Sequence, residues 1–140
     1  MPPTHHKDYS ATPLPKKLGI RQGSRLLVGG APEGFSIGRL PTGTEVVAVG
    51  RRPLDVIVLF VLRSAELRRR FPALARSLAP DGRLWVAWPK KAARIDTDLT
   101  FGVVQSVGLD AGLVDNKSAS IDETYQDLQF VYRLKDRPRA

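Results

Sequence analysis

Residues 55–62 (DVIVLFVL) constrain the fold more than any other part of the chain, because seven of the eight are apolar. The run has the length of a β-strand and falls far short of the ~18 residues that a membrane-spanning helix needs. A nearly continuous apolar strand is typical of a parallel sheet that is covered on both faces. We therefore expect a central buried strand here.

The rest of the chain alternates between strand and helix patterns. Further strands are expected at 24–30, 45–49, 83–88, 113–121 and 125–134. Helices are expected at 14–20, 32–39 (one or two turns), 64–78 and 99–111. This order predicts an α/β fold, namely a three-layer, mainly parallel Rossmann-like sheet. The last two strands are joined by residues 122–124 alone, so they should form a C-terminal antiparallel hairpin.

Local signals refine these elements. Ser64 is placed to cap the helix that follows it, and Pro72 should kink or split that helix. A turn is expected at 80–82. The helix at 99–111 should be capped by one of three preceding residues: Asp96, Thr97 or Asp98.

Length and composition favour a single soluble domain. The 140 residues give room for a single domain at 12–135, with a disordered tail at 1–11 and a polar tail at 136–140. The absence of cysteine excludes disulfides and thiolate sites. His5 and His6 lie in the tail without a third ligand nearby, so no metal site is predicted. No signal-peptide or membrane pattern is seen, which predicts a soluble, cytoplasmic protein.

The net charge of +8 is concentrated in the middle of the chain. Residues 51–95 contain eleven Lys and Arg but only three Asp and Glu, and the remainder is neutral. Clustered cations attract anions, so a small anionic molecule or an acidic partner is a reasonable expectation. The alternative is a solvated, Arg-rich helix face.

A candidate binding site follows from the expected strand order. Ligands of open parallel sheets collect at the carboxyl ends of the strands. Seven residues are expected at that edge and form the predicted ligand site: Gly29, Gly30, Arg63, Trp88, Pro89, Lys90 and Lys91. The lysines and arginine would supply charge, and the glycine amides could meet an anion. Alternatively, Trp88 packs beneath a helix and both lysines are solvated.

Two resemblances carry further expectations. Residues 78–86 (LAPDGRLWV) resemble a segment of class I methyltransferases in which leucine, proline and glycine precede a strand. The chain is also similar to an uncharacterised family of small bacterial proteins at residues 30–35, 53–60, 85–91 and 112–117. Both resemblances imply a methyltransferase-like fold, and the second implies no established activity.

The features that bind S-adenosylmethionine in that fold are incomplete here. The family's loop after the first strand has the form acid-x-Gly-x-Gly-x-Gly, whereas residues 29–34 read GGAPEG. The family's ribose-binding acid after the second strand is replaced by Gly50, Arg51 and Arg52. Residues 50–54 are also too few for a usual crossover. The strand at 45–49 should therefore lie at an edge, run antiparallel or be hardly a strand, in a reduced version of the fold. We therefore predict no cofactor and no tight binding of S-adenosylmethionine.

The functional expectation is a non-enzymatic, reduced methyltransferase-like domain that binds an anionic small ligand or partner. No catalytic residues are predicted, because no nucleophile elbow or phosphate loop is present. One alternative is an S-adenosylmethionine-dependent methyltransferase with a degenerate cofactor loop. Another is a nucleic-acid-binding module, although no helix-turn-helix, zinc finger or aromatic-rich sheet motif supports it.

Overall fold

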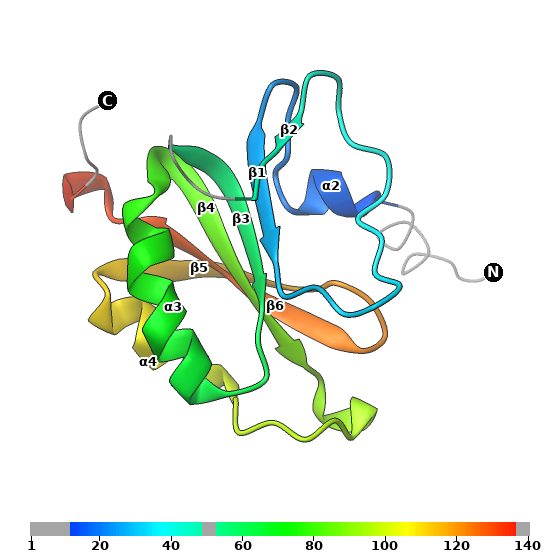
Figure 1. Cartoon of the computed structure of the whole chain (residues 1–140). Helices are drawn as coiled ribbons and strands as arrows, with labels where there is room; N and C mark the ends of the chain where they lie inside the picture. Colours follow the sequence, from blue (N-terminus) through cyan, green and yellow to red (C-terminus); the bar gives the residue numbers. More distant parts are fainter. Residues whose placement is uncertain (1–11, 49–52, 137–140) are drawn as a thin grey trace.

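The computed structural model describes residues 12–48 and 53–136 (Figure 1). Three features predicted from the sequence lie outside the described residues. They are the tail at 1–11, most of the tail at 136–140, and Arg51 and Arg52, which stand where the family has a ribose-binding acid. Six strands form one sheet in the order β2-β1-β3-β4-β6-β5. Strands β2, β1, β3 and β4 are parallel, and β6 runs antiparallel to both β4 and β5. The predicted α/β fold with a C-terminal hairpin is confirmed.

The strands are β1 (Arg25–Gly29), β2 (Glu45–Val46), β3 (Leu54–Phe60), β4 (Leu78–Pro89), β5 (Leu113–Ser120) and β6 (Tyr125–Tyr132). The helices are α2 (Leu14–Lys17), α3 (Ser64–Arg76) and α4 (Phe101–Asp110). Two short 3-10 turns complete the described chain, η1 (Lys91–Ala93) and η2 (Leu134–Asp136). No helix in these described ranges is long and apolar enough to cross a membrane.

Strand β3 is buried on both faces, as its apolar run predicts. Ile57 and Leu59 pack in the cluster beneath α3 and α4. Val56, Val58 and Phe60 pack in the opposite cluster, which α2 and residues 35–40 cover. Figure 1 shows these two coverings on opposite sides of the sheet, with the two long helices on one side only. The layer around α2 is therefore mostly extended chain rather than helix.

The helical turns predicted at 32–39 are wrong. This segment contains a turn at residues 33–34 and then runs without regular structure. Gly34 and Gly38 have φ angles of +82° and +96°, and these left-handed conformations interrupt any helix. The segment instead contributes Phe35 and Ile37 to the apolar cluster around Trp85.

Two other local predictions need correction. The turn predicted at 80–82 lies inside β4, where the register against β3 shifts and residues 79–82 bulge. A Cβ on Gly82 would lie 2.8 Å from the Leu54 carbonyl oxygen, so glycine permits the close approach of these strands. Pro72 lies within α3, which continues unsplit from Ser64 to Arg76.

The edge prediction for residues 45–49 is confirmed by β2, but only Glu45 and Val46 form the strand, and Val49 lies outside the described residues. They pair in parallel with the first residues of β1, so the antiparallel alternative is wrong. At the other end of the chain, β6 stops at Tyr132, and Leu134 lies in η2 with 80% of its surface exposed.

The helix caps come from unexpected residues. The start of α3 is capped by Asp98, whose Oδ1 accepts the Ser64 N–H at 2.8 Å and whose Oδ2 accepts the Ser64 hydroxyl at 2.9 Å. These hydrogen bonds lower the pKa of Asp98. Thr100 caps α4, because its Oγ1 accepts the Val103 N–H at 3.2 Å. The predicted cap roles of Ser64, Asp96, Thr97 and Asp98 are therefore wrong, and the segment before α4 is tied to the start of α3.

Candidate functional site

Two neighbouring cavities lie at the carboxyl ends of the parallel strands. The first, here called the Gly30 cavity, has a volume of about 350 Å³ beside the ends of β1 and β3. The second, here called the Trp88 cavity, has a volume of about 420 Å³ beside the end of β4. Both volumes fall within the range of small-molecule sites.

The predicted site residues divide between these cavities. The Gly30 cavity is lined by Gly30, Pro32, Phe60, Val61, Leu62, Arg63, Glu66 and Tyr125. The Trp88 cavity is lined by Trp88, Pro89, Lys90, Lys91, Ile95, Thr97, Leu99, Thr100, Phe101 and Gln126. Gly29 lines neither cavity.

Asp96 and Thr97 form hydrogen bonds to two residues that line the Gly30 cavity. The Thr97 hydroxyl donates to the Leu62 carbonyl at 2.6 Å. Asp96 accepts from the Arg63 guanidinium at 2.5 Å, which raises the pKa of Arg63. Arg63, which supplies a cation to the Gly30 cavity, is thus held by the segment that also lines the Trp88 cavity.

The Gly30 cavity combines aromatic and charged groups. Phe60 packs edge-on against Tyr125, with ring centroids 5.3 Å apart, and against Phe35 at 4.9 Å. Arg63 and Glu66 add a guanidinium and a carboxylate. An aromatic wall beside both charge signs suits a ligand with a flat ring and a zwitterionic end.

One of the two glycines serves the packing of the strand ends. Gly30 has a φ of +70°, and a Cβ there would lie 2.5 Å from the Phe60 carbonyl oxygen. A Cβ on Gly29 would lie 3.1 Å from the Arg70 Nη2. Close approach of β1 to β3 therefore accounts for Gly30 without any ligand, whereas a Cβ on Gly29 would crowd only the end of a flexible arginine side chain.

The residues at the end of β4 have separate roles. Trp88 is 2% exposed and belongs to the core under α3 and α4, while it also lines the cavity. The Lys90 ammonium donates to the Ser120 hydroxyl at 2.7 Å and to the Asp122 carbonyl at 2.6 Å. Lys90 thus holds the turn between β5 and β6, whereas Lys91 is exposed at the cavity.

Exposed apolar side chains mark this edge, and sequence reasoning missed them. Six large apolar residues of the described chain are exposed, and three of them line the two cavities: Leu62, Ile95 and Phe101. Arg94, next to Ile95, is the one described non-glycine residue with a positive φ, at 55°. Such conformations concentrate at functional sites. Ile95 and Phe101 flank a polar stretch, so no apolar periodicity signalled them.

The positive charge of residues 51–95 is partly balanced by acids from elsewhere in the chain. Arg63 pairs with Asp96, and Arg68 lies 3.7 Å from Asp110. Arg70 is half-buried and lies 3.4 Å from Glu66, which is one of the three acids already counted within residues 51–95. A count along the sequence therefore overstates the positive charge that these helices present, and a basic surface stays a prediction.

Solved structures of S-adenosylmethionine-dependent methyltransferases share this fold. A methyltransferase from Aquifex aeolicus has a TM-score of 0.55 and 15% identity, with 82% of this chain and 85% of that chain covered. A TehB-like methyltransferase from Corynebacterium glutamicum has a TM-score of 0.54 and 14% identity, with 91% and 85% covered. Magnesium protoporphyrin IX methyltransferase from Synechocystis, with bound S-adenosylmethionine, has a TM-score of 0.55 and 9% identity, with 90% and 77% covered.

These likenesses establish the methyltransferase-like fold alone. No family model and no curated protein matches the sequence, so the resemblance to a small bacterial family stays a prediction. Within the described chain, the residues that follow β2 are Val47 and Ala48, which carry no carboxylate for a ribose.

Proposed function

We propose that the protein is a methyltransferase-fold protein that binds S-adenosylmethionine in the Gly30 cavity and methylates a small anionic acceptor in the Trp88 cavity. The observation that carries this proposal is the pair of cavities at the carboxyl edge of the parallel strands, whose linings are joined by the Thr97–Leu62 hydrogen bond. The fold it shares with methyltransferases supports the choice of ligand.

The residues of the Gly30 cavity would bind the cofactor by complementary charge and stacking. Arg63 has donors beyond the one that Asp96 accepts, and these would hold the ligand carboxylate. Glu66 would accept from the ligand ammonium, and Phe60 with Tyr125 would contact its ring. When bound, S-adenosylmethionine supplies an electrophilic methyl group.

The Trp88 cavity would hold the acceptor. Its wall is apolar at Trp88, Ile95 and Phe101, and Lys91 supplies a cation. An acceptor with an apolar body and an anionic group would satisfy both features. Such an acceptor is the anionic ligand expected from the sequence. Its anionic group would pair with Lys91, because Lys90 is engaged by the β5–β6 turn.

Calorimetric titration with S-adenosylmethionine tests the cofactor assignment. The glycine loop differs from the family's and Gly30 serves strand packing, so we expect a Kd of the order of 100 µM rather than low micromolar. Arg63→Gln should weaken binding about tenfold, as expected for losing one charge-assisted contact. Arg68→Gln is the matched control, because Arg68 also pairs with one carboxylate but lies away from the cavity. No heat of binding, or equal weakening in both variants, would overturn the assignment.

A second candidate is a binding protein of the same fold without methyl transfer. The structural role of Gly30 favours it, because strand packing alone explains this residue of the loop. Mass spectrometry of a panel of aromatic carboxylates incubated with protein and S-adenosylmethionine distinguishes the two candidate functions. A methylated product supports the enzyme, whereas ligand binding without product supports the second candidate.

A further inference from the structure

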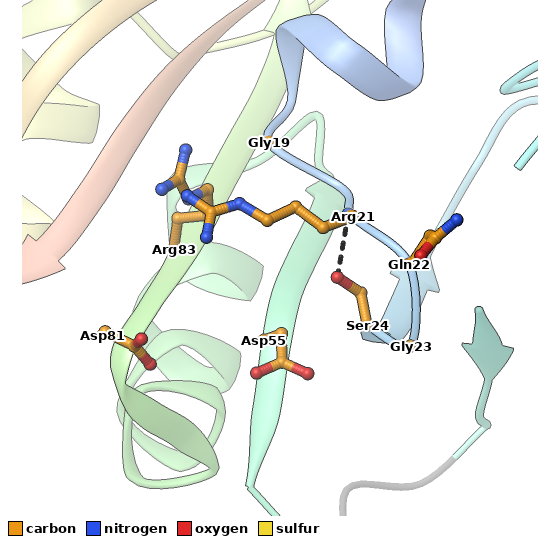
Figure 2. A pocket seen from close by; sticks show the side chains of 8 residues that line it. All are labelled: Gly19, Arg21, Gln22, Gly23, Ser24, Asp55, Asp81 and Arg83. Carbon is orange, nitrogen blue, oxygen red and sulfur yellow. Dashed lines mark hydrogen bonds between the residues drawn. The ribbon is translucent and has the colours of Figure 1, made fainter. Parts of the chain in front are cut away.

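A small polar cavity lies at the opposite edge of the sheet, beside the amino ends of β1, β3 and β4. Its volume is about 190 Å³, and we call it the Arg21–Arg83 cavity. Figure 2 shows its lining, which includes Arg21, Ser24, Asp55, Asp81 and Arg83. None of its lining residues lines the Gly30 cavity or the Trp88 cavity.

Two guanidinium groups form one side of this cavity. The Arg21 side chain extends toward Arg83 (Figure 2). Neither guanidinium has a hydrogen-bond or ion-pair partner among the described residues. The Arg83 guanidinium lies against the backbone of Gly19, where a Cβ would overlap it, and Gly19 has a φ of +83°. Two like charges that converge without an acid between them favour an anionic group.

Two carboxylates lie on another side of the same cavity. Asp55 and Asp81 are separated from the two guanidinium groups in Figure 2, and no ion pair joins the two sets. Asp55 Oδ2 already accepts the Arg25 N–H at 2.8 Å, whereas Asp81 is exposed and engages no described residue. A simple anion would leave the carboxylates uncompensated, but a molecule with both charges would use both sides.

We propose that the Arg21–Arg83 cavity binds a small zwitterion of the α-amino-acid class. The ligand carboxylate contacts Arg21 and Arg83, whose planar donors match its geometry. The ligand ammonium faces Asp81. At roughly 30 Å³ for each water, the cavity has room for about six waters, which is enough for a small amino acid.

Amide chemical-shift titration of the isotope-labelled protein tests the proposal. Three probes differ only in charge: alanine, N-acetylalanine, which lacks the ammonium, and alaninamide, which lacks the carboxylate. Because the cavity is shallow and the ligand small, a Kd for alanine of the order of 1 mM is expected. The shifts should fall on residues 19–24 and 81–83, and both other probes should bind at least about tenfold more weakly.

Variants separate the cavity from general surface effects. Arg83→Gln and Asp81→Asn should each weaken alanine binding several-fold, while Arg76→Gln, at an exposed position of α3, should leave it unchanged. Equal shifts with alanine and N-acetylalanine would overturn the zwitterion and indicate a plain anion site. No saturable shift at residues 19–24 would show that the four charged groups are only solvated.

Discussion

Replacing Asp127 by Asn should remove a pH dependence of stability that the wild-type fold carries. Asp127 lies in β6 between Ala87 of β4 and Ala119 of β5, and it is 1% exposed. Neither of its carboxylate oxygens has a hydrogen-bond partner of good geometry among the described residues, although the Ala119 backbone N–H acts to lower the pKa of Asp127. Burial raises its pKa from 3.8 to about 7, although the charges of Lys17 and Lys117 act in the opposite direction.

The raised pKa sets the sign and the size of the effect. The folded protein holds this proton more tightly than the unfolded chain, so the contribution of Asp127 to stability is complete below about pH 4 and is lost as pH rises through about 7. The shift is about three pH units, and each is worth ~1.4 kcal/mol, so ionisation costs the fold up to about 4 kcal/mol.

Urea unfolding of wild type and Asp127→Asn across about pH 4 to pH 8 measures this contribution. The free energy of unfolding of the variant should increase relative to that of the wild type as pH rises, because the amide cannot ionise in the buried position. Asp136→Asn, at an exposed position, is the control for a loss of one carboxylate. A difference between wild type and Asp127→Asn that stays constant with pH would refute the reasoning.

Two further predictions concern the helices. Gly108→Ala places a Cβ against the Phe130 ring and should lower the free energy of unfolding by about 1–3 kcal/mol. In the same helix, the Cβ of Gly102→Ala meets nothing closer than 4.0 Å, so this variant should leave the free energy of unfolding unchanged or raise it by up to ~1 kcal/mol. Urea denaturation distinguishes them, and equal effects would contradict the packing. Asp98→Ala should loosen the first turn of α3 by removing the Ser64 contacts, as measured by amide hydrogen exchange. Because the pKa of Asp98 is lowered, its contribution is present above its unfolded pKa and lost as pH falls through the folded value, so a protection difference that persists in acid would contradict the cap.

The sheet could be predicted because its signals are local. An apolar run specifies β3 whatever its neighbours are, and the short link at 122–124 leaves β5 and β6 no arrangement other than a hairpin. The extended segment at 32–39 could not be predicted, because Phe35 and Ile37 pack against an apolar cluster that contains residues far away in the sequence. The bulge at 79–82 likewise depends on the fit of Gly82 against β3.

The candidate site was predictable in position but not in detail. The carboxyl end of β4 carries Trp88 and Lys91 to a cavity, as strand direction implies. The partners of Lys90 come from the β5–β6 turn, about thirty residues away, and the partner of Arg63 comes from the segment before α4. Sequence spacing contains no information about such distant pairs, so it could not tell which cations are already engaged.

The most direct test of the central claim is an amide chemical-shift titration with S-adenosylhomocysteine, which reports where the ligand binds. Our account predicts saturable shifts at Gly30, at Arg63 to Glu66 and at Tyr125, around the Gly30 cavity. Residues 19–24 at the opposite edge should be unaffected. Shifts confined to other parts of the protein, or none at ligand concentrations well above 100 µM, about the expected Kd, would contradict a cofactor site at the carboxyl edge of the sheet.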